Sequence, residues 1–96
     1  MARRRYLITY DIVYDRRRDR VHRALLDAGD WIQFSVFLCD LDDRERIKLR
    51  GRLDELINHA EDQILTVDLG LADREVDQVI ASLGRDFALP CRVVVV

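Results

Sequence analysis

Residues 6–13 read YLITYDIV, and this segment decides the fold. It is rich in β-branched and aromatic residues and has no helical period, which predicts a largely buried strand. The only charged residue in the segment, Asp11, lies near the carboxyl end of this strand. A carboxylate in an apolar strand is unfavourable unless it is paired, hydrogen-bonded or bound to a metal. Asp11 is therefore the first candidate for a functional residue.

An amphipathic helix and a second β region are predicted after this strand. Asp15 is expected to cap a helix that begins at Arg16, and Gly29 is expected to end it. Residues 31–41 (WIQFSVFLCDL) form either one long strand or two short strands joined by a reversal near residues 33–35. The apolar stripe of the helix is formed by Val21, Ala24, Leu25 and Ala28.

A second helix and a further strand complete the regular pattern. Asp42 and Glu45 have the spacing of a capping box at the start of this helix. Gly51 lies inside the helix, where glycine costs about 1 kcal/mol relative to alanine. Residues 63–69 (QILTVDL) read as a strand. The apolar face of the second helix is formed by Leu49, Leu53, Leu56, Ile57 and Ala60.

This order of elements predicts an α+β fold, a ferredoxin-like βαββαβ sandwich with an antiparallel sheet. The whole chain, residues 1–96, is expected to be one domain, with its core in residues 6–69 and a C-terminal extension over residues 70–96. Within the extension, residues 76–83 have helical spacing, which predicts a short helix that ends at Leu83. The four valines at 93–96 predict an extra strand that pairs with an edge of a partner subunit. Two helices cover one face of the sheet, so the other face is open unless a second subunit covers it.

Composition and charge indicate a soluble protein with one basic face. The chain is 49% hydrophobic and 35% charged, as in ordinary globular domains. It contains no segment typical of a membrane span or a signal peptide, so we expect a cytoplasmic protein that does not bind membranes. Cys39 and Cys91 lie in apolar runs and are expected to be reduced, buried thiols. Residues 1–25 carry eight Arg and three Asp, a net charge of +5, whereas residues 26–96 carry −7.

Two interpretations of Asp11 stay open at this point. Mg²⁺ is commonly held by one or two carboxylates together with waters and substrate phosphates. One Asp11 from each chain of a symmetric dimer would supply two carboxylates, if the strands lie near the twofold axis. Alternatively, the Asp11 carboxylate hydrogen-bonds the turn that follows the strand.

The cluster Arg16, Arg17 and Arg18 lies in the first turn of the predicted helix. Cations at a helix N-terminus oppose the helix dipole, and phosphate binding by the arginines and the helix amides would explain their position. A solvated charged face is the alternative.

Other side chains also allow a functional and a structural interpretation. Aromatic rings either stack on bases or fill the core; the candidates are Tyr10, Tyr14, Trp31, Phe34 and Phe37. His22 and His59 are expected to have passive roles on the helices. Ser35 has no partner in the sequence that would make it a nucleophile.

Several segments together resemble one known family. Residues 6–12 resemble its first-strand signature, in which alternating apolar residues precede Tyr-Asp-Ile. Residues 16–18 resemble its Arg-rich first helix. Residues 33–37 (QFSVF) are similar to its Gln-x-Ser-Val-Phe core, and Asp40 and Leu41 also fit. The chain thereby resembles, over residues 6–69, the CRISPR-associated adaptation family, the small endonuclease-like subunit that is the smaller partner of the spacer-acquisition integrase.

The resemblance implies a set of roles. Asp11 would be the catalytic, Mg²⁺-binding residue, paired with its symmetry mate in a homodimer formed through the open sheet face. Nucleic acid would be bound by Arg16, Arg17, Arg18 and Tyr10, with Ser35 and Phe37 in supporting positions. The C-terminal segment would cross to the partner subunit as an added strand.

The same resemblance implies a function with alternatives. The family contains metal-dependent endonucleases that hydrolyse RNA or double-stranded DNA, and its members also bridge integrase dimers in prokaryotic cytoplasm. The alternatives are a non-catalytic DNA-binding scaffold and a toxin-like endoribonuclease on the same fold. A ligand-binding regulatory domain is disfavoured, because the chain has no Gly-rich ligand loop.

Overall fold

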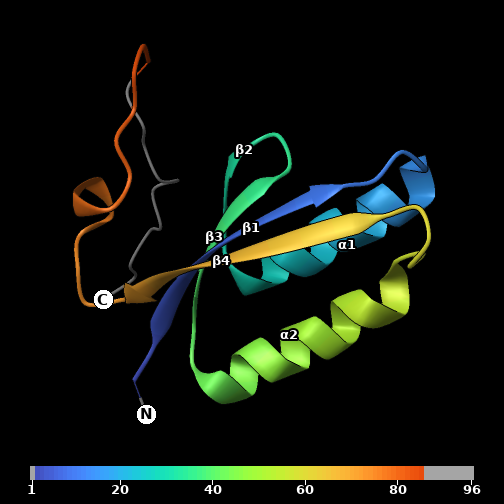
Figure 1. Cartoon of the computed structure of the whole chain (residues 1–96), viewed down its shortest axis with the longest axis horizontal. Coiled ribbons are helices and arrows are strands. Elements are labelled where there is room, and N and C mark those ends of the chain that lie inside the picture. Colours follow the sequence, from blue (N-terminus) through green and yellow to red (C-terminus); the bar gives the residue numbers. More distant parts are fainter. Residues whose placement is uncertain (1, 86–96) are drawn as a thin grey trace, which may run out of the picture.

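The computed structural model describes residues 2–85 and has the predicted βαββαβ order. The strands form one antiparallel sheet in the order β2-β3-β1-β4, and both helices cover the same face of it (Figure 1). The elements are β1 (Arg4–Asp11), α1 (Asp15–Ala28), β2 (Asp30–Gln33), β3 (Val36–Leu41), α2 (Asp43–Leu56), β4 (Gln63–Leu71) and a single 3₁₀ turn (Val76–Gln78).

The core lies between the central strands and the two helices. Alternate residues of β1 point into it, because successive side chains of a strand point to opposite faces. These are Tyr6, Ile8 and Tyr10, and the buried Ile12 follows the strand. Side chains from the other elements complete the core, among them Val21, Leu25, Phe37, Cys39, Leu41, Leu49 and Leu53.

The second β region is two strands, which decides between the alternatives left by the sequence. β2 and β3 pair as a hairpin with a turn at Phe34 and Ser35. Phe34 has a φ of +35°, which gives the chain its sharp reversal. The predicted core position of Cys39 is confirmed: the thiol is free and fully buried, and burial raises its pKa to about 12. Cys91 lies outside the described residues.

The N-terminal cap of α2 is as predicted from the sequence, whereas that of α1 is not. Asp42 and Glu45 form the predicted capping box, with the Asp42 carboxylate 2.8 Å from the Glu45 amide. Asp15 does not cap α1: the N-cap is Tyr14, which makes no side-chain cap bond, and Asp15 is already in the first turn. The Asp15 carboxylate instead accepts a hydrogen bond from Arg18 at 2.7 Å.

The predicted helix over residues 76–83 is wrong. The structure forms only the 3₁₀ turn at its start, where the amides of Val79 and Ile80 both bond the Val76 carbonyl. Val76, Val79 and Ile80 are β-branched and favour helices weakly, and so short a helix is marginal without an apolar surface to pack on. The four valines at 93–96 lie outside the described residues, so the extra strand stays a prediction.

Candidate active site

Asp11 is the last residue of β1, on the sheet face away from the helices. Its neighbours Tyr10 and Ile12 are buried on the helix side, whereas Asp11 is exposed. It lies opposite Gln63 of β4 in the sheet register. Within residues 2–85 its carboxylate makes no hydrogen bond or ion pair, so the alternative in which it bonds the following turn is not observed.

The loop after Asp11 is held in place by Arg18 instead. The guanidinium donates to the carbonyls of Ile12 and Val13, both at 3.3 Å, and to the Asp15 carboxylate at 2.7 Å. These bonds tie the end of β1 to the first turn of α1. Arg18 therefore positions the loop that follows Asp11. This structural role differs from the phosphate binding that was expected of it.

Arg17 forms ion pairs with two acidic residues in the loop before β4. Its Nε donates to Asp62 at 2.8 Å and its NH2 to Glu61 at 2.9 Å. The Asp62 side chain is only 1% exposed and also accepts from the Asn58 amide at 2.8 Å. The hydrogen bond from Arg17, together with that amide, lowers the pKa of Asp62, and the same pairing raises the pKa of Arg17. The geometry makes Arg17 a link between α1 and the loop before β4.

This ion pair predicts how stability depends on pH. Because the folded-state pKa of Asp62 lies below its ordinary value of 3.8, its contribution is present above that value and is lost as pH falls through the folded-state pKa. Asp62→Asn should therefore lower the melting temperature at pH 7 and flatten its decline below pH 4.

Glu61→Gln is the matched control for this prediction. It removes the other charge beside Arg17, but Glu61 is largely exposed and exposed ion pairs contribute little. Melting curves between pH 3 and pH 7 test the difference. Equal and small effects of the two substitutions would show that Arg17 is not fixed by Asp62.

Arg16 is the member of the cluster that is left for a ligand. It is exposed and makes no hydrogen bond or ion pair in the described part of the chain. It lies in the first turn of α1, where the helix amides also favour anions. Of the three predicted arginines, Arg16 therefore has the geometry of a free phosphate ligand.

Tyr10 does not have the surface position that base stacking requires. Its ring is buried, burial raises its pKa, and its hydroxyl is 2.9 Å from Nδ1 of His22. Phe37 is fully buried beside it. Both rings therefore support the site from the core, and the predicted contact of Tyr10 with nucleic acid is corrected on this ground.

His22 joins this core to the β2–β3 hairpin. Its ring packs edge-on against Phe37 at 5.0 Å and against Trp31 at 5.1 Å between centroids. The passive role predicted for His22 is thus a packing role, although no sequence pattern indicates its partners. His59 lies beyond α2 and its Nε2 is 3.3 Å from Asp54.

Ser35 supports the end of the sheet near Asp11. Its carbonyl accepts the Tyr10 amide at 3.2 Å, and its hydroxyl lies 3.4 Å from the Thr9 hydroxyl. The turn of the β2–β3 hairpin is thereby fastened to β1 just before Asp11. The supporting role expected of Ser35 stays a prediction.

The side chains around Asp11 supply only some of the ligands that a divalent cation needs. In residues 2–85 no three His, Cys, Asp or Glu side chains gather where they would hold a metal ion. Asp11 offers one exposed, unpaired carboxylate, which is the type of oxygen ligand that Mg²⁺ prefers. A complete site needs further oxygen atoms, which waters, a phosphate or a second carboxylate would supply.

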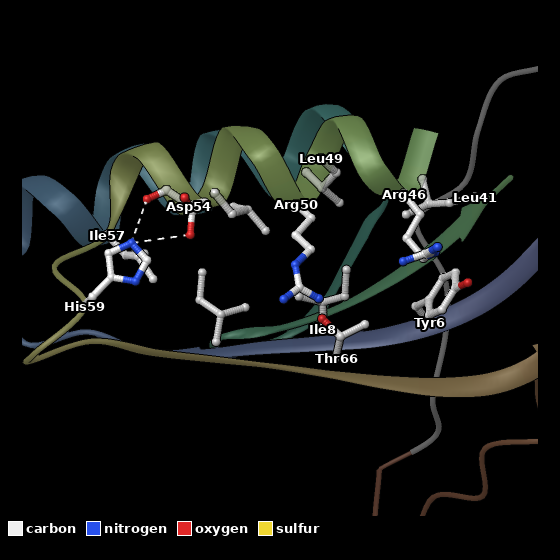
Figure 2. A pocket seen from close by; sticks show the side chains of 12 residues that line it. Tyr6, Ile8, Leu41, Arg46, Leu49, Arg50, Asp54, Ile57, His59 and Thr66 are labelled. Carbon is white, nitrogen blue, oxygen red and sulfur yellow. Dashed lines mark hydrogen bonds and ion pairs between the residues drawn. The ribbon is translucent and has the colours of Figure 1, made fainter. Parts of the chain in front are cut away.

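A hollow of about 420 Å³ lies elsewhere, between α2 and strands β1 and β4. Figure 2 shows Arg46 and Arg50 on α2 on one side, with Ile8 and Thr66 of the strands opposite. Neither Asp11 nor Arg16 lines it. It lies on the helix face of the sheet, so it is separate from the candidate active site.

These features define a ferredoxin-like α+β protein with an unpaired aspartate at the end of its first strand. The family model described as CRISPR associated protein Cas2 matches residues 4–77. The chain therefore belongs to the Cas2 family.

Relatives and solved structures agree with this assignment. The chain is 40% identical over 82 residues to the CRISPR-associated endoribonuclease Cas2 of Geobacter sulfurreducens, with 85% of each chain covered. It is 38% identical to CRISPR-associated endoribonuclease Cas2 1 of Rhodospirillum rubrum, covering 90% of this chain and 83% of that one. The crystal structure of Streptococcus pyogenes Cas2 matches with a TM-score of 0.70 and 26% identity, over 83% of this chain and 99% of that one.

Proposed function

We propose that this chain is a metal-dependent endonuclease of CRISPR spacer acquisition that hydrolyses phosphodiester bonds as a homodimer. The observation that carries the proposal is the position of Asp11. Its carboxylate is exposed and unpaired at a strand end, although Arg17 and Arg18, which pair with other carboxylates, lie only a few residues away. The relatives named as endoribonucleases support the same activity.

The open face of the sheet supports a homodimer. Leu65 and Val67 of β4 are about half exposed there, at 50% and 45%, and they lie opposite Thr9 and Leu7 of β1 in register. An exposed apolar strip on a sheet face is typical of a protein interface. A second copy packed there about a twofold axis would bring its own Asp11 toward the first.

Two Asp11 carboxylates would complete a site for Mg²⁺, which is commonly held by one or two carboxylates. When bound, such an ion activates water and stabilises charge on a phosphoryl oxygen. The chain's own residues bind and position the substrate: Arg16 contacts phosphates, and Arg18 holds the loop beside Asp11. None of the helices in residues 2–85 is both long and apolar enough to cross a membrane, and we place the protein in the prokaryotic cytoplasm.

Removal of metal tests this function. Labelled single-stranded RNA and duplex DNA should be cut in Mg²⁺ and left intact in EDTA, and binding should weaken as salt rises, because phosphate contacts release counterions. The measurement is gel analysis of cleavage with and without chelator, alongside binding at two salt concentrations. Cleavage that continues in EDTA, or binding that ignores salt, would contradict the proposal.

A second candidate is a non-catalytic scaffold that binds double-stranded DNA and bridges dimers of the CRISPR integrase. It is favoured because in the described residues no group of three or more His, Cys, Asp or Glu side chains forms a metal site around Asp11. In this case neither RNA nor DNA is cut in Mg²⁺, while DNA binding keeps its salt dependence. A toxin-like endoribonuclease would cut RNA alone and would not bind the integrase.

A further inference from the structure

Phe34 combines two unfavourable features at the turn of the β2–β3 hairpin. Its side chain is 84% exposed, and its φ of +35° is the only positive value of a non-glycine residue in the described part of the chain. A bulky L-residue rarely adopts such a backbone conformation. Strained residues of this kind concentrate at binding sites, where the surrounding structure holds them in place.

The surrounding structure does hold this turn. The indole Nε1 of Trp31 donates to the Phe34 carbonyl at 2.6 Å. The Trp31 ring packs edge-on against His22, and His22 packs in turn against the fully buried Phe37. A chain of aromatic contacts therefore anchors the exposed residue to the core, and the tip is presented on a rigid base.

The anchored tip lies at the same end of the sheet as Asp11. Ser35 and Tyr10 are joined by a backbone hydrogen bond of 3.2 Å. Phe34 is the residue next to Ser35, and Asp11 is the residue next to Tyr10. The exposed ring and the unpaired carboxylate are thus each one residue away from the same bonded pair, and α1 with the free Arg16 begins shortly after Asp11.

We propose that Phe34 is a substrate-binding residue that stacks on an unpaired base of a single-stranded nucleic acid whose backbone reaches Asp11. The inference rests on the proposed function, because it takes nucleic acid as the ligand. An exposed ring suits a base face, and Arg16, in the first turn of the helix that follows Asp11, suits a phosphate. Such stacking is insensitive to sequence, because every base has a π face. Bases inside a duplex are hidden in their own stack, so the site selects single strands over duplexes.

Binding of a fluorescent oligonucleotide tests this assignment. The probes are a single-stranded oligonucleotide carrying 2-aminopurine and its fully paired duplex, both in EDTA so that no cleavage occurs. Phe34→Ala should weaken single-strand binding by about 5- to 150-fold, the range for loss of one base–aromatic stack. Duplex binding should stay within about twofold, and Phe34→Tyr should keep the wild-type affinity and the quenching of 2-aminopurine.

Two further variants separate loss of stacking from loss of structure. Ile47 of α2 is an apolar residue that is 62% exposed. Ile47→Ala removes this side chain and should leave single-strand binding unchanged. Phe34→Gly removes the ring and also relieves the positive φ, since glycine adopts it freely. It should therefore be at least as stable as wild type while binding single strands as weakly as Phe34→Ala.

The outcomes distinguish this inference from the proposed function. The stacking role is overturned if Phe34→Ala and Phe34→Gly bind the single strand as wild type does. It is also overturned if both variants weaken binding of the single strand and of the duplex equally. The exposed ring would then be available for contact with a protein partner. That result leaves metal-dependent cleavage standing. If wild type fails to cut in Mg²⁺ but the ring-dependent preference for single strands is present, the nuclease function fails and the stacking role stands.

Discussion

Asp11→Asn is expected to reduce cleavage of RNA and DNA by at least about 100-fold, because an amide keeps the shape of the carboxylate but loses the charge that would hold a divalent cation. Binding should be retained, since Arg16 and the helix amides are untouched. The Asp11 carboxylate bonds nothing in residues 2–85, so its replacement should not alter stability. Initial cleavage rates in Mg²⁺, with melting temperatures of both proteins, measure the effect.

Asp19→Asn is the matched control for this substitution. Asp19 is also exposed, lies on α1 close to the arginine cluster, and makes no hydrogen bond or ion pair in the described residues. It removes the same charge without touching the end of β1, so its cleavage rate should stay within about twofold of wild type. An Asp11→Asn protein that cuts as fast as this control would remove Asp11 from the chemistry.

Gly29→Ala is expected to destabilise the fold by about 3 kcal/mol, the upper part of the usual range for overpacking a core. A Cβ at position 29 would lie 2.5 Å from Sγ of Cys39 and 2.5 Å from the carbonyl oxygen of Leu38. The second contact is to the backbone of β3, which cannot move without disturbing the sheet. Urea denaturation measures the free energy of unfolding.

Gly51→Ala is the matched control for Gly29→Ala, because it is the same substitution at a position where the added methyl group meets no other atom. No atom lies within 4 Å of a Cβ built at Gly51, and alanine in an exposed helix is favoured by about 1 kcal/mol over glycine. It should therefore raise the unfolding free energy. Two alanine variants of equal stability would show that α1 does not approach β3 as closely as the structure has it.

Much of the fold could be predicted because its signals are local. The apolar run of residues 6–13 and the capping box at Asp42 mark their elements without reference to the rest of the chain. The end of α1 was predicted correctly at Gly29, but for an incomplete reason: its backbone is extended, with a φ of −168°. Glycine is required there by the close approach of β3, which only the folded chain creates.

The candidate site was only partly predictable for the same physical reason. Arg16 and Arg17 are adjacent in sequence, but Arg17 is neutralised by Asp62, which is 45 positions away along the chain. No local sequence pattern indicates the ion pair between Arg17 and Asp62. Tyr10 is different: the alternation of Tyr6, Ile8 and Tyr10 along β1 already places its ring on the buried face. Asp11, one residue further, is placed on the other face by the same alternation.

The pairing of two Asp11 carboxylates in one site is tested most directly by mixing wild type with Asp11→Asn at increasing ratios and measuring cleavage after subunit exchange. If both carboxylates of a symmetric dimer are needed, the rate falls as the square of the wild-type fraction. An equal mixture then keeps about one quarter of the wild-type rate. A linear fall, with about one half of the rate left in the equal mixture, would contradict the shared site and show that each chain acts alone.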